Sequence, residues 1–377
     1  MLLVADENIP GLEACFAGRA EIRRIPGRQM SPDDVRHADI LLVRSVTKVN
    51  RTLLEGSRVR YVGTCTIGRD HIDEQALEEL GVAVMSAPGC NAVAVVEYVL
   101  TALVLLEQLH GLPLSGSTLG VIGCGQVGGR LVQAARQLGM NVVVCDPFLS
   151  HAPAPLLSLE ELLSQARIVS LHVPLMHRGP RPTHHLLGAR ELACMRPDVC
   201  LVQTSRGGVV DEEALLQSFH EHPDRLLIMD VWQDEPRLNP DVLARATLAT
   251  PHVAGYSYEG KFRGTWMIYQ WLCKQMDWPM DVSWEQCLGE RTPVALETLA
   301  DCHSLSSALL AMVPLLRDDA TLRAVQRALD PERGFDRLRR DYPLRFEFSG
   351  YTVPASEHPV CAQLRALGCQ TGEFYRT

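Results

Sequence analysis

A glycine-rich segment in the middle of the chain, GCGQVG at residues 123–128, constrains the fold more than any other feature. It follows an apolar run at 119–122 and precedes a helical pattern at 129–138. A second apolar run at 141–145 then ends in an acid. This order of strand, glycine turn, helix and strand is the context that G-x-G-x-x-G needs to bind a dinucleotide. Gly123 would make the tight turn, Gly125 would let a pyrophosphate approach the backbone, and Gly128 would let helix and strand pack closely.

The acid after the second run, Asp146, indicates which dinucleotide binds. It lies 18 residues after Gly128, close to the spacing of a carboxylate that binds the ribose 2′-hydroxyl. A carboxylate there repels a 2′-phosphate, so the pattern favours NAD over NADP. The alternative is an ordinary βαβ turn without a ligand, and the matched context favours NAD.

The position of this turn, 122 residues into the chain, indicates that another domain folds ahead of it. A chain of 377 residues has room for two or three domains. Strand patterns alternate with helical ones, which predicts parallel sheets. The strands are expected at 2–5, 39–45, 60–66 and 82–85, then at 167–173, 199–204, 226–231 and 246–250. An apolar helix at 92–109 would link the two domains, and a helix at 259–276 would return the chain to the first.

The C-terminal region carries no catalytic motif. Residues 292–330 have helical character, and residues 342–349 alternate apolar and polar side chains as a half-buried strand does. The region is interpreted as a small interaction or oligomerisation domain.

Composition excludes several classes of protein. A net charge of −9 argues against a nucleic-acid binder. The 12 cysteines show no C-x-x-C pair and no regular spacing with histidines, so neither a metal site nor a disulfide framework is expected. No apolar run reaches the length of a membrane span, and the start lacks the basic and apolar regions of a signal peptide. We therefore expect a cytoplasmic protein that does not bind membranes.

Three segments that each follow a predicted strand carry the groups for chemistry. They are SRGG at 205–208, DEP at 234–236 and TPHVAGY at 250–256. Because parallel strands end at the same edge of a sheet, these segments could meet in one crevice. Arg206 could bind a substrate carboxylate, His252 could take a hydroxyl proton, and Glu235 could orient the imidazole. Taken singly, each residue has an equally plausible structural role.

These motifs, in this order, resemble the D-2-hydroxyacid dehydrogenases over about residues 1–280. The resemblance implies that Arg206, Glu235 and His252 are catalytic. It also implies a Rossmann-type NAD domain inserted into a flavodoxin-like substrate domain, followed by a small α+β C-terminal dimerisation domain. The expected boundaries are 1–92 with 258–284, 93–257, and 285–377. Glutamate rather than glutamine at position 235 argues against the related formate dehydrogenases.

The resemblance also implies the binding residues. The cofactor contacts would be Gly123, Gly125, Gln126, Val127, Gly128, Asp146, Val173, Pro174, Thr204, Ser205, Arg206, Asp230 and Gly255. Ser45, Thr66 and Tyr256 would touch the substrate, although Ser45 and Thr66 could equally cap helices. The segments DENIP at 6–10, RSVT at 44–47 and GTCTIG at 63–68 resemble family members that act on a small phosphorylated 2-hydroxy acid. Arg44 and Arg69 are the candidates for binding its phosphate, with ordinary surface charges as the alternative.

Two alternatives stay open. The first is another 2-hydroxyacid dehydrogenase, such as one that acts on 3-phosphoglycerate, since the three catalytic candidates do not distinguish these substrates. The second belongs to another class. Some proteins of this fold sense NAD and bind partners as corepressors without turnover. The complete arginine, glutamate and histidine set favours an enzyme, which would act as a homodimer through its C-terminal domain.

Overall fold

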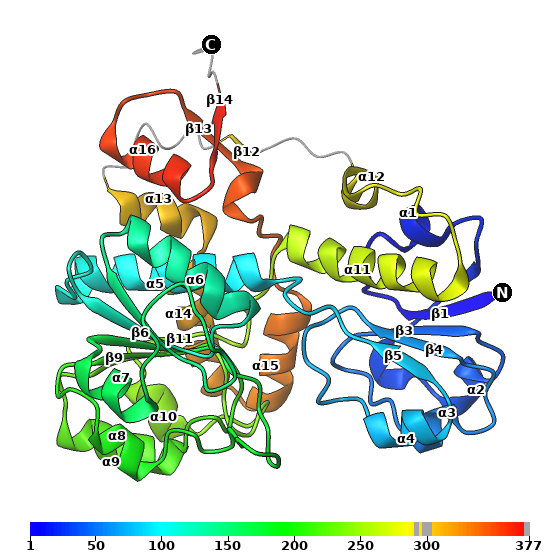
Figure 1. The fold of residues 1–377 in the computed structure, drawn as a ribbon, viewed down its shortest axis with the longest axis horizontal. Coiled ribbons are helices and arrows are strands. Elements are labelled where there is room, and N and C mark those ends of the chain that lie inside the picture. Colours follow the sequence, from blue (N-terminus) through cyan, green and yellow to red (C-terminus); the bar gives the residue numbers. More distant parts are fainter. Residues whose placement is uncertain (290–293, 296–303, 373–377) are drawn as a thin grey trace. The chain divides into compact units, whose positions relative to one another are not determined.

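The computed structural model describes residues 1–289, 294–295 and 304–372, and the chain divides into two compact units (Figure 1). The first unit consists of Met1–Asn91 and Ser257–Thr292, and the second of Ala92–Tyr256 and Pro293–Thr377. Two separate stretches of chain thus form the first unit, as the mid-chain position of the glycine turn predicts. The C-terminal residues pack with the nucleotide-binding region, so a separate domain at 285–377 and the other expected boundaries stay predictions.

The first unit is built on a five-stranded parallel sheet with the strand order β2-β1-β3-β4-β5. This is the order of flavodoxin-like sheets, so the fold predicted for this unit is confirmed. The strands are β1 (Leu2–Asp6), β2 (Glu21–Ile25), β3 (Ile40–Val43), β4 (Tyr61–Thr64) and β5 (Ala83–Met85). The helices are α1 (Leu12–Phe16), α2 (Pro32–Val35), α3 (Arg51–Leu54), α4 (Glu74–Glu79), α11 (Tyr258–Met276) and α12 (Trp284–Leu288). The sequence pattern missed β2 because this edge strand leaves most of its charged side chains in solvent.

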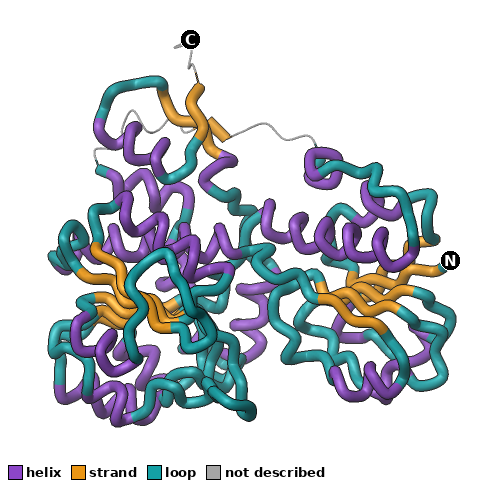
Figure 2. The backbone as a smooth tube through the Cα atoms, in the orientation of Figure 1, coloured by secondary structure: helices purple, strands orange, loops and turns teal. Residues whose placement is uncertain are grey.

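The second unit contains a six-stranded parallel sheet with the order β11-β10-β9-β8-β6-β7. Figure 2 draws the strands in orange and the helices in purple. Its strands are β6 (Thr118–Ile122), β7 (Asn141–Cys145), β8 (Ile168–Leu171), β9 (Cys200–Gln203), β10 (Leu226–Met229) and β11 (Leu248–Ala249). Its helices are α6 (Gln126–Gln137), α7 (Leu159–Gln165), α8 (Ala189–Ala193), α9 (Glu212–Glu221) and α10 (Pro240–Arg245). The strand order reverses between β6 and β8, so the glycine turn after β6 stands at the switch point where such sheets bind ligands.

The expectation that no apolar run reaches the length of a membrane span is wrong, because helix α5 (Ala92–His110) is long and apolar enough by length and composition alone. In the structure, however, most of it is buried within the second unit, where it packs against α6 and α13 (Leu305–Met312). It is therefore a core helix, close to the bounds that the sequence predicts.

The C-terminal part of the second unit differs from the prediction. After α13 come α14 (Leu315–Gln326), α15 (Pro331–Arg340) and α16 (Pro359–Ala366), with a parallel sheet of the order β12-β13-β14. These strands are β12 (Val294–Ala295), β13 (Tyr351–Pro354) and β14 (Gln370–Gly372). The helical character expected at 292–330 holds for α13 and α14, whereas β12 interrupts it. The expectation for 290–293 and 296–303 lies outside the described residues.

The strand predicted at 342–349 is wrong, and the cause is that burial does not follow the expected alternation. Arg345, Glu347 and Phe348 are buried, whereas Leu344 is exposed. Arg345 donates a hydrogen bond of 2.7 Å to the carbonyl of Ala94, and the amide of Phe348 donates one to Glu97. The side chain of Arg345 and the backbone of Phe348 therefore bind α5, and strand β13 starts only after this anchored segment.

Candidate active site

The glycine turn has the geometry that each of its glycines needs. Gly123 has a φ of +87°, and a Cβ at Gly128 would lie 2.0 Å from the carbonyl oxygen of Gly123. Both positions therefore require glycine. Gly125 is exposed, and a Cβ added there would meet no described atom within 4 Å. This open face lies at the N-cap of α6, where backbone amides can receive a pyrophosphate.

The carboxylate of Asp146 is fixed beside this turn. Its Oδ2 accepts a hydrogen bond of 2.9 Å from the amide of Cys124, and its Oδ1 accepts one of 3.1 Å from Phe148. The side chain is thus oriented at the end of β7, the strand next to the glycine turn. This is a suitable place for a ribose-binding acid.

The residues after β8 and β9 offer further contacts for a cofactor. Val173 and Pro174 follow β8, and a Cβ on Gly123 would lie 2.8 Å from Cγ1 of Val173. Thr204 follows β9, and its buried hydroxyl has no hydrogen-bond partner among the described residues. A buried polar atom without a partner is costly, and a bound ligand can satisfy it. The open turn, the fixed acid and this hydroxyl fit NAD.

We expect replacement of Asp146 to change the choice between NAD and NADP. Asp146→Asn keeps a hydrogen-bond acceptor beside Cys124 but removes the charge that repels a 2′-phosphate. The ratio of kcat/KM with NAD to that with NADP should fall by about tenfold or more, a factor worth about 1.4 kcal/mol. Asp146→Ala should show the same fall with weaker binding of both cofactors. An unchanged ratio in both variants would remove Asp146 from the ribose site.

His252 and Glu235 form a hydrogen-bonded pair, as the order of the motifs predicts. Nδ1 of His252 lies 2.8 Å from Oε2 of Glu235, and the amide of Trp232 donates to Oε1 at 3.0 Å. Burial acts to raise the pKa of Glu235, but His252, Arg339 and the Trp232 amide together bring it below its ordinary value. An ionised carboxylate only accepts hydrogen bonds, so Nδ1 carries the proton and Nε2 is left to act as a base.

The backbone at His252 is unusual. Its φ is +56°, in the left-handed region that non-glycine residues seldom occupy. Such conformations cost about 1–3 kcal/mol and cluster at functional sites. This φ sets the direction in which the side chain of His252 leaves the backbone, and the hydrogen bond to Glu235 holds the ring itself.

Trp232 connects the three predicted motifs through its backbone and its buried indole ring. The sequence analysis did not identify this residue as part of the site. Its amide binds Glu235, its indole Nε1 donates to the carbonyl of Thr250 at 3.1 Å, and its own carbonyl lies against Gly207. The segments that begin at 205, 234 and 250 thus meet around one residue. A tryptophan in an apolar strand pattern gives no sign of this role.

Asp230 anchors the segment that bears His252. It is buried, its Oδ1 accepts from the Thr250 hydroxyl and the Val253 amide, and its Oδ2 accepts from Ala254. Burial raises its pKa, while the nearby His252 and these hydrogen bonds act in the opposite direction. Its contact with NAD, and that of Gly255, stay predictions.

Arg206 is half-buried in the same region of the second unit. One of its guanidinium nitrogens donates to the carbonyl of Ser205 at 2.8 Å, and Gln203 donates to the carbonyl of Arg206. These bonds position the SRGG segment at the end of β9. The role of Arg206 in binding a carboxylate stays a prediction.

The predicted substrate residues of the first unit follow β3 and β4. Ser45 is exposed, and the hydroxyl of Thr66 lies 2.8 Å from that of Thr64. Arg44 lies near Lys261 of α11, which the sequence analysis did not select. Arg69 instead forms an ion pair of 3.1 Å with Glu74. Arg44 is thus the better candidate for binding an anion.

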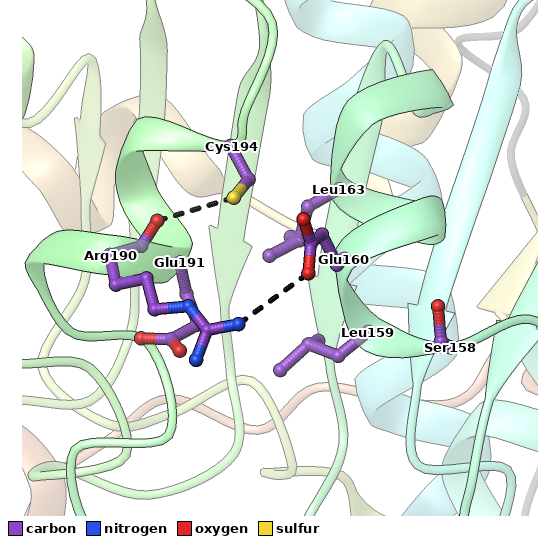
Figure 3. A pocket seen from close by; sticks show the side chains of 7 residues that line it. All are labelled: Ser158, Leu159, Glu160, Leu163, Arg190, Glu191 and Cys194. Atoms are coloured by element: carbon purple, nitrogen blue, oxygen red, sulfur yellow. Dashed lines mark hydrogen bonds and ion pairs between the residues drawn. The ribbon is translucent and has the colours of Figure 1, made fainter.

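A shallow hollow of about 270 Å³ between α7 and α8 is separate from these residues (Figure 3). An ion pair of 3.5 Å between Arg190 and Glu160 crosses it, and Cys194 lines it as well. None of the predicted site residues lines this hollow.

Comparison with known proteins identifies the family to which this chain is similar. A family model described as "D-isomer specific 2-hydroxyacid dehydrogenase, NAD binding domain" matches residues 101–254, and a domain of unknown function matches residues 290–368. An NAD-bound 3-phosphoglycerate dehydrogenase from Entamoeba histolytica has a similar fold. It has a TM-score of 0.64 and 23% identity, over 78% of this chain and 99% of that one.

Closer relatives match almost the whole chain. Erythronate-4-phosphate dehydrogenases from Marinobacter nauticus and Pseudomonas putida are 46% and 48% identical, over 98% of this chain and 99% of theirs. The chain therefore belongs to the D-isomer specific 2-hydroxyacid dehydrogenase family, among the members named erythronate-4-phosphate dehydrogenase. It is an NAD-dependent dehydrogenase, so the enzyme class predicted from the motifs is confirmed.

Proposed function

We propose that the protein oxidises 4-phospho-D-erythronate at C2 with NAD and yields 2-oxo-3-hydroxy-4-phosphobutanoate, a step in the synthesis of pyridoxal 5′-phosphate. The observation that carries the proposal is the 2.8 Å pair of His252 and Glu235 in a chain whose relatives bear this substrate in their name. The names of the relatives, rather than the pair alone, select the substrate.

The chemistry divides between the cofactor and the side chains. Bound NAD supplies the hydride acceptor. Nε2 of His252 takes the proton of the C2 hydroxyl, so the substrate loses one hydride and one proton. Glu235 holds the Nδ1–H and stabilises the imidazolium that results. Arg206 binds the substrate carboxylate through paired hydrogen bonds, which orients C2.

The substrate phosphate is proposed to bind at Arg44 and Lys261 in the first unit, with Ser45 and Thr66 contacting the substrate nearby. Lys261 is exposed to solvent, but neighbouring protein atoms reduce its hydration, and this effect and then the Arg44 guanidinium lower its pKa. Two cations held close together repel each other, and a phosphate dianion would relieve that repulsion. Tyr256, from the second unit, is proposed as a further substrate contact.

A substrate panel tests the function. NADH formation should be fastest with 4-phosphoerythronate and slower by about tenfold or more with 3-phosphoglycerate and with unphosphorylated erythronate, because each lacks groups that the site would bind. Lys261→Gln should reduce the ratio of the rate of NADH formation with 4-phosphoerythronate to that with unphosphorylated erythronate. Good turnover of 3-phosphoglycerate without turnover of 4-phosphoerythronate would instead assign the chain to 3-phosphoglycerate oxidation. NADH binding without any turnover would favour the corepressor-like alternative.

The C-terminal residues are proposed to join two copies of the chain, and the protein is proposed to be cytoplasmic. Three leucines of this region, Leu316, Leu329 and Leu344, are 50%, 106% and 66% exposed. Exposed apolar side chains form an interface between proteins where they lie together in one patch, and we propose that these do. Light scattering of the purified protein should give twice the chain mass, and the mass of a single chain would contradict the dimer.

A further inference from the structure

An arginine of the C-terminal region reaches the proton-transfer pair. Arg339 lies in the last turn of α15, and its guanidinium nitrogen NH1 is 3.7 Å from Oε2 of Glu235. This is the same carboxylate oxygen that holds His252 at 2.8 Å. Arg339 also forms a hydrogen bond with Tyr256. One carboxylate oxygen therefore lies between an imidazole and a guanidinium.

The side chain of Arg339 is largely shielded from solvent and is held by neighbouring side chains. Its side chain is only 21% exposed and that of Glu235 17%. Its guanidinium carbon lies 5.8 Å from the centre of the Phe335 ring, one turn earlier in the same helix. A cation held this way at low exposure acts on a neighbouring carboxylate with little screening by water.

We propose that Arg339 is a positioning residue for the hydride-transfer reaction. Its guanidinium keeps the Glu235 carboxylate ionised and turned toward Nδ1 of His252, and through Glu235 it fixes the ring that takes the substrate proton. The inference rests on the proposed roles of His252 and Glu235. It also gives the C-terminal domain of unknown function a part in catalysis, because Arg339 lies within residues 290–368 and outside the matched NAD domain.

The other acids near Glu235 favour its protonated form, and a nearby cation opposes this. The titratable groups around the pair are His252, Tyr256, Arg339, Glu212, Asp230 and Asp234. Glu212, Asp230 and Asp234 are carboxylates, and like charges together with burial favour the neutral form of an acid. Arg339 is the cation from α15 that opposes this tendency.

The test compares the pH dependence of kcat/KM in the wild type with that in Arg339→Met and Arg339→Lys. His252 must be unprotonated to accept the substrate proton, and a nearby cation opposes protonation of the pair. Removing that cation lets the pair bind a proton at higher pH. The acid limb of Arg339→Met should therefore move up by about one pH unit, with kcat lower by about tenfold. Arg339→Lys keeps the charge, so its acid limb should lie close to the pH of the wild-type limb.

A matched control removes one arginine from the same helix end. Arg340 is exposed and pairs with Asp341, so Arg340→Gln should keep the wild-type profile. A titration of the His252 ring by NMR on the full-length protein should show the same upward move in Arg339→Met without depending on turnover.

Two results would overturn the inference. One is an Arg339→Met variant in which the His252 ring titrates as it does in the wild type. The other is that Arg339→Met and Arg339→Lys show the same pH dependence of kcat/KM. A wild type that oxidises no 2-hydroxy acid would contradict the proposed function instead, while the ring titration would still decide on Arg339.

Discussion

Replacing His252 should lower kcat for the oxidation by about 10²–10⁴-fold and leave the affinity for NAD nearly unchanged. The expectation follows from its place in the structure. Nδ1 is held by Glu235 at 2.8 Å, so Nε2 is the nitrogen that we propose as the base for the substrate hydroxyl. The glycine turn and Asp146, which we expect to bind NAD, lie elsewhere in the second unit and do not depend on the imidazole. Steady-state kinetics for kcat and a fluorescence titration for NADH separate the two effects.

The choice of substituent matters because His252 has a φ of +56°. Asparagine tolerates this left-handed conformation better than alanine does, so His252→Asn removes the base with less backbone strain. We expect both variants to lose kcat to a similar degree, and His252→Ala to be the less stable on heating. Full activity in His252→Asn, or an equal loss of kcat and NADH affinity, would mean that the histidine has a structural role.

The sequence predicts much of this site because its motifs are local. A glycine turn, an acid at a strand end and short polar segments after apolar strands are each visible within about ten residues. In a parallel sheet, strand ends meet at one edge, so these segments could be expected to meet, and the resemblance to the family implied that Glu235 is the partner of His252. The strand order of both sheets is likewise consistent with the fold class that these patterns predict.

The parts that could not be predicted depend on contacts between distant segments. Arg339 lies more than a hundred residues after Glu235, and nothing in its helix marks it as part of the site. Residues 342–349 show the pattern of a half-buried strand, yet Arg345 turns inward because Glu97 and the backbone of α5 provide its partners, and Glu347 is buried as well. Burial of these polar side chains breaks the alternation on which the prediction depended.

The second large effect is expected from a substitution of Gly207, the glycine that lies against the backbone of Trp232. A Cβ on Gly207 would lie 1.8 Å from the carbonyl oxygen of Trp232 and 2.4 Å from its carbonyl carbon. Backbone atoms cannot move aside as the end of a flexible side chain can, so Gly207→Ala must push the two segments apart. Trp232 also holds Glu235 through its amide and Thr250 through its indole. The displacement should therefore reach the catalytic pair.

We expect Gly207→Ala to lower kcat by about 10²-fold, because a shift of about 1 Å at a catalytic group has that effect. Overpacking should also reduce the free energy of unfolding by about 1–3 kcal/mol. The matched control is Gly129→Ala in α6, where the added Cβ would lie at an ordinary 3.7 Å from the nearest atom, the Cys124 carbonyl oxygen. That variant should keep wild-type kcat and unfold at the same temperature or higher, since alanine favours a helix. Wild-type kinetics and stability in Gly207→Ala would show that the contact with Trp232 does not position Glu235.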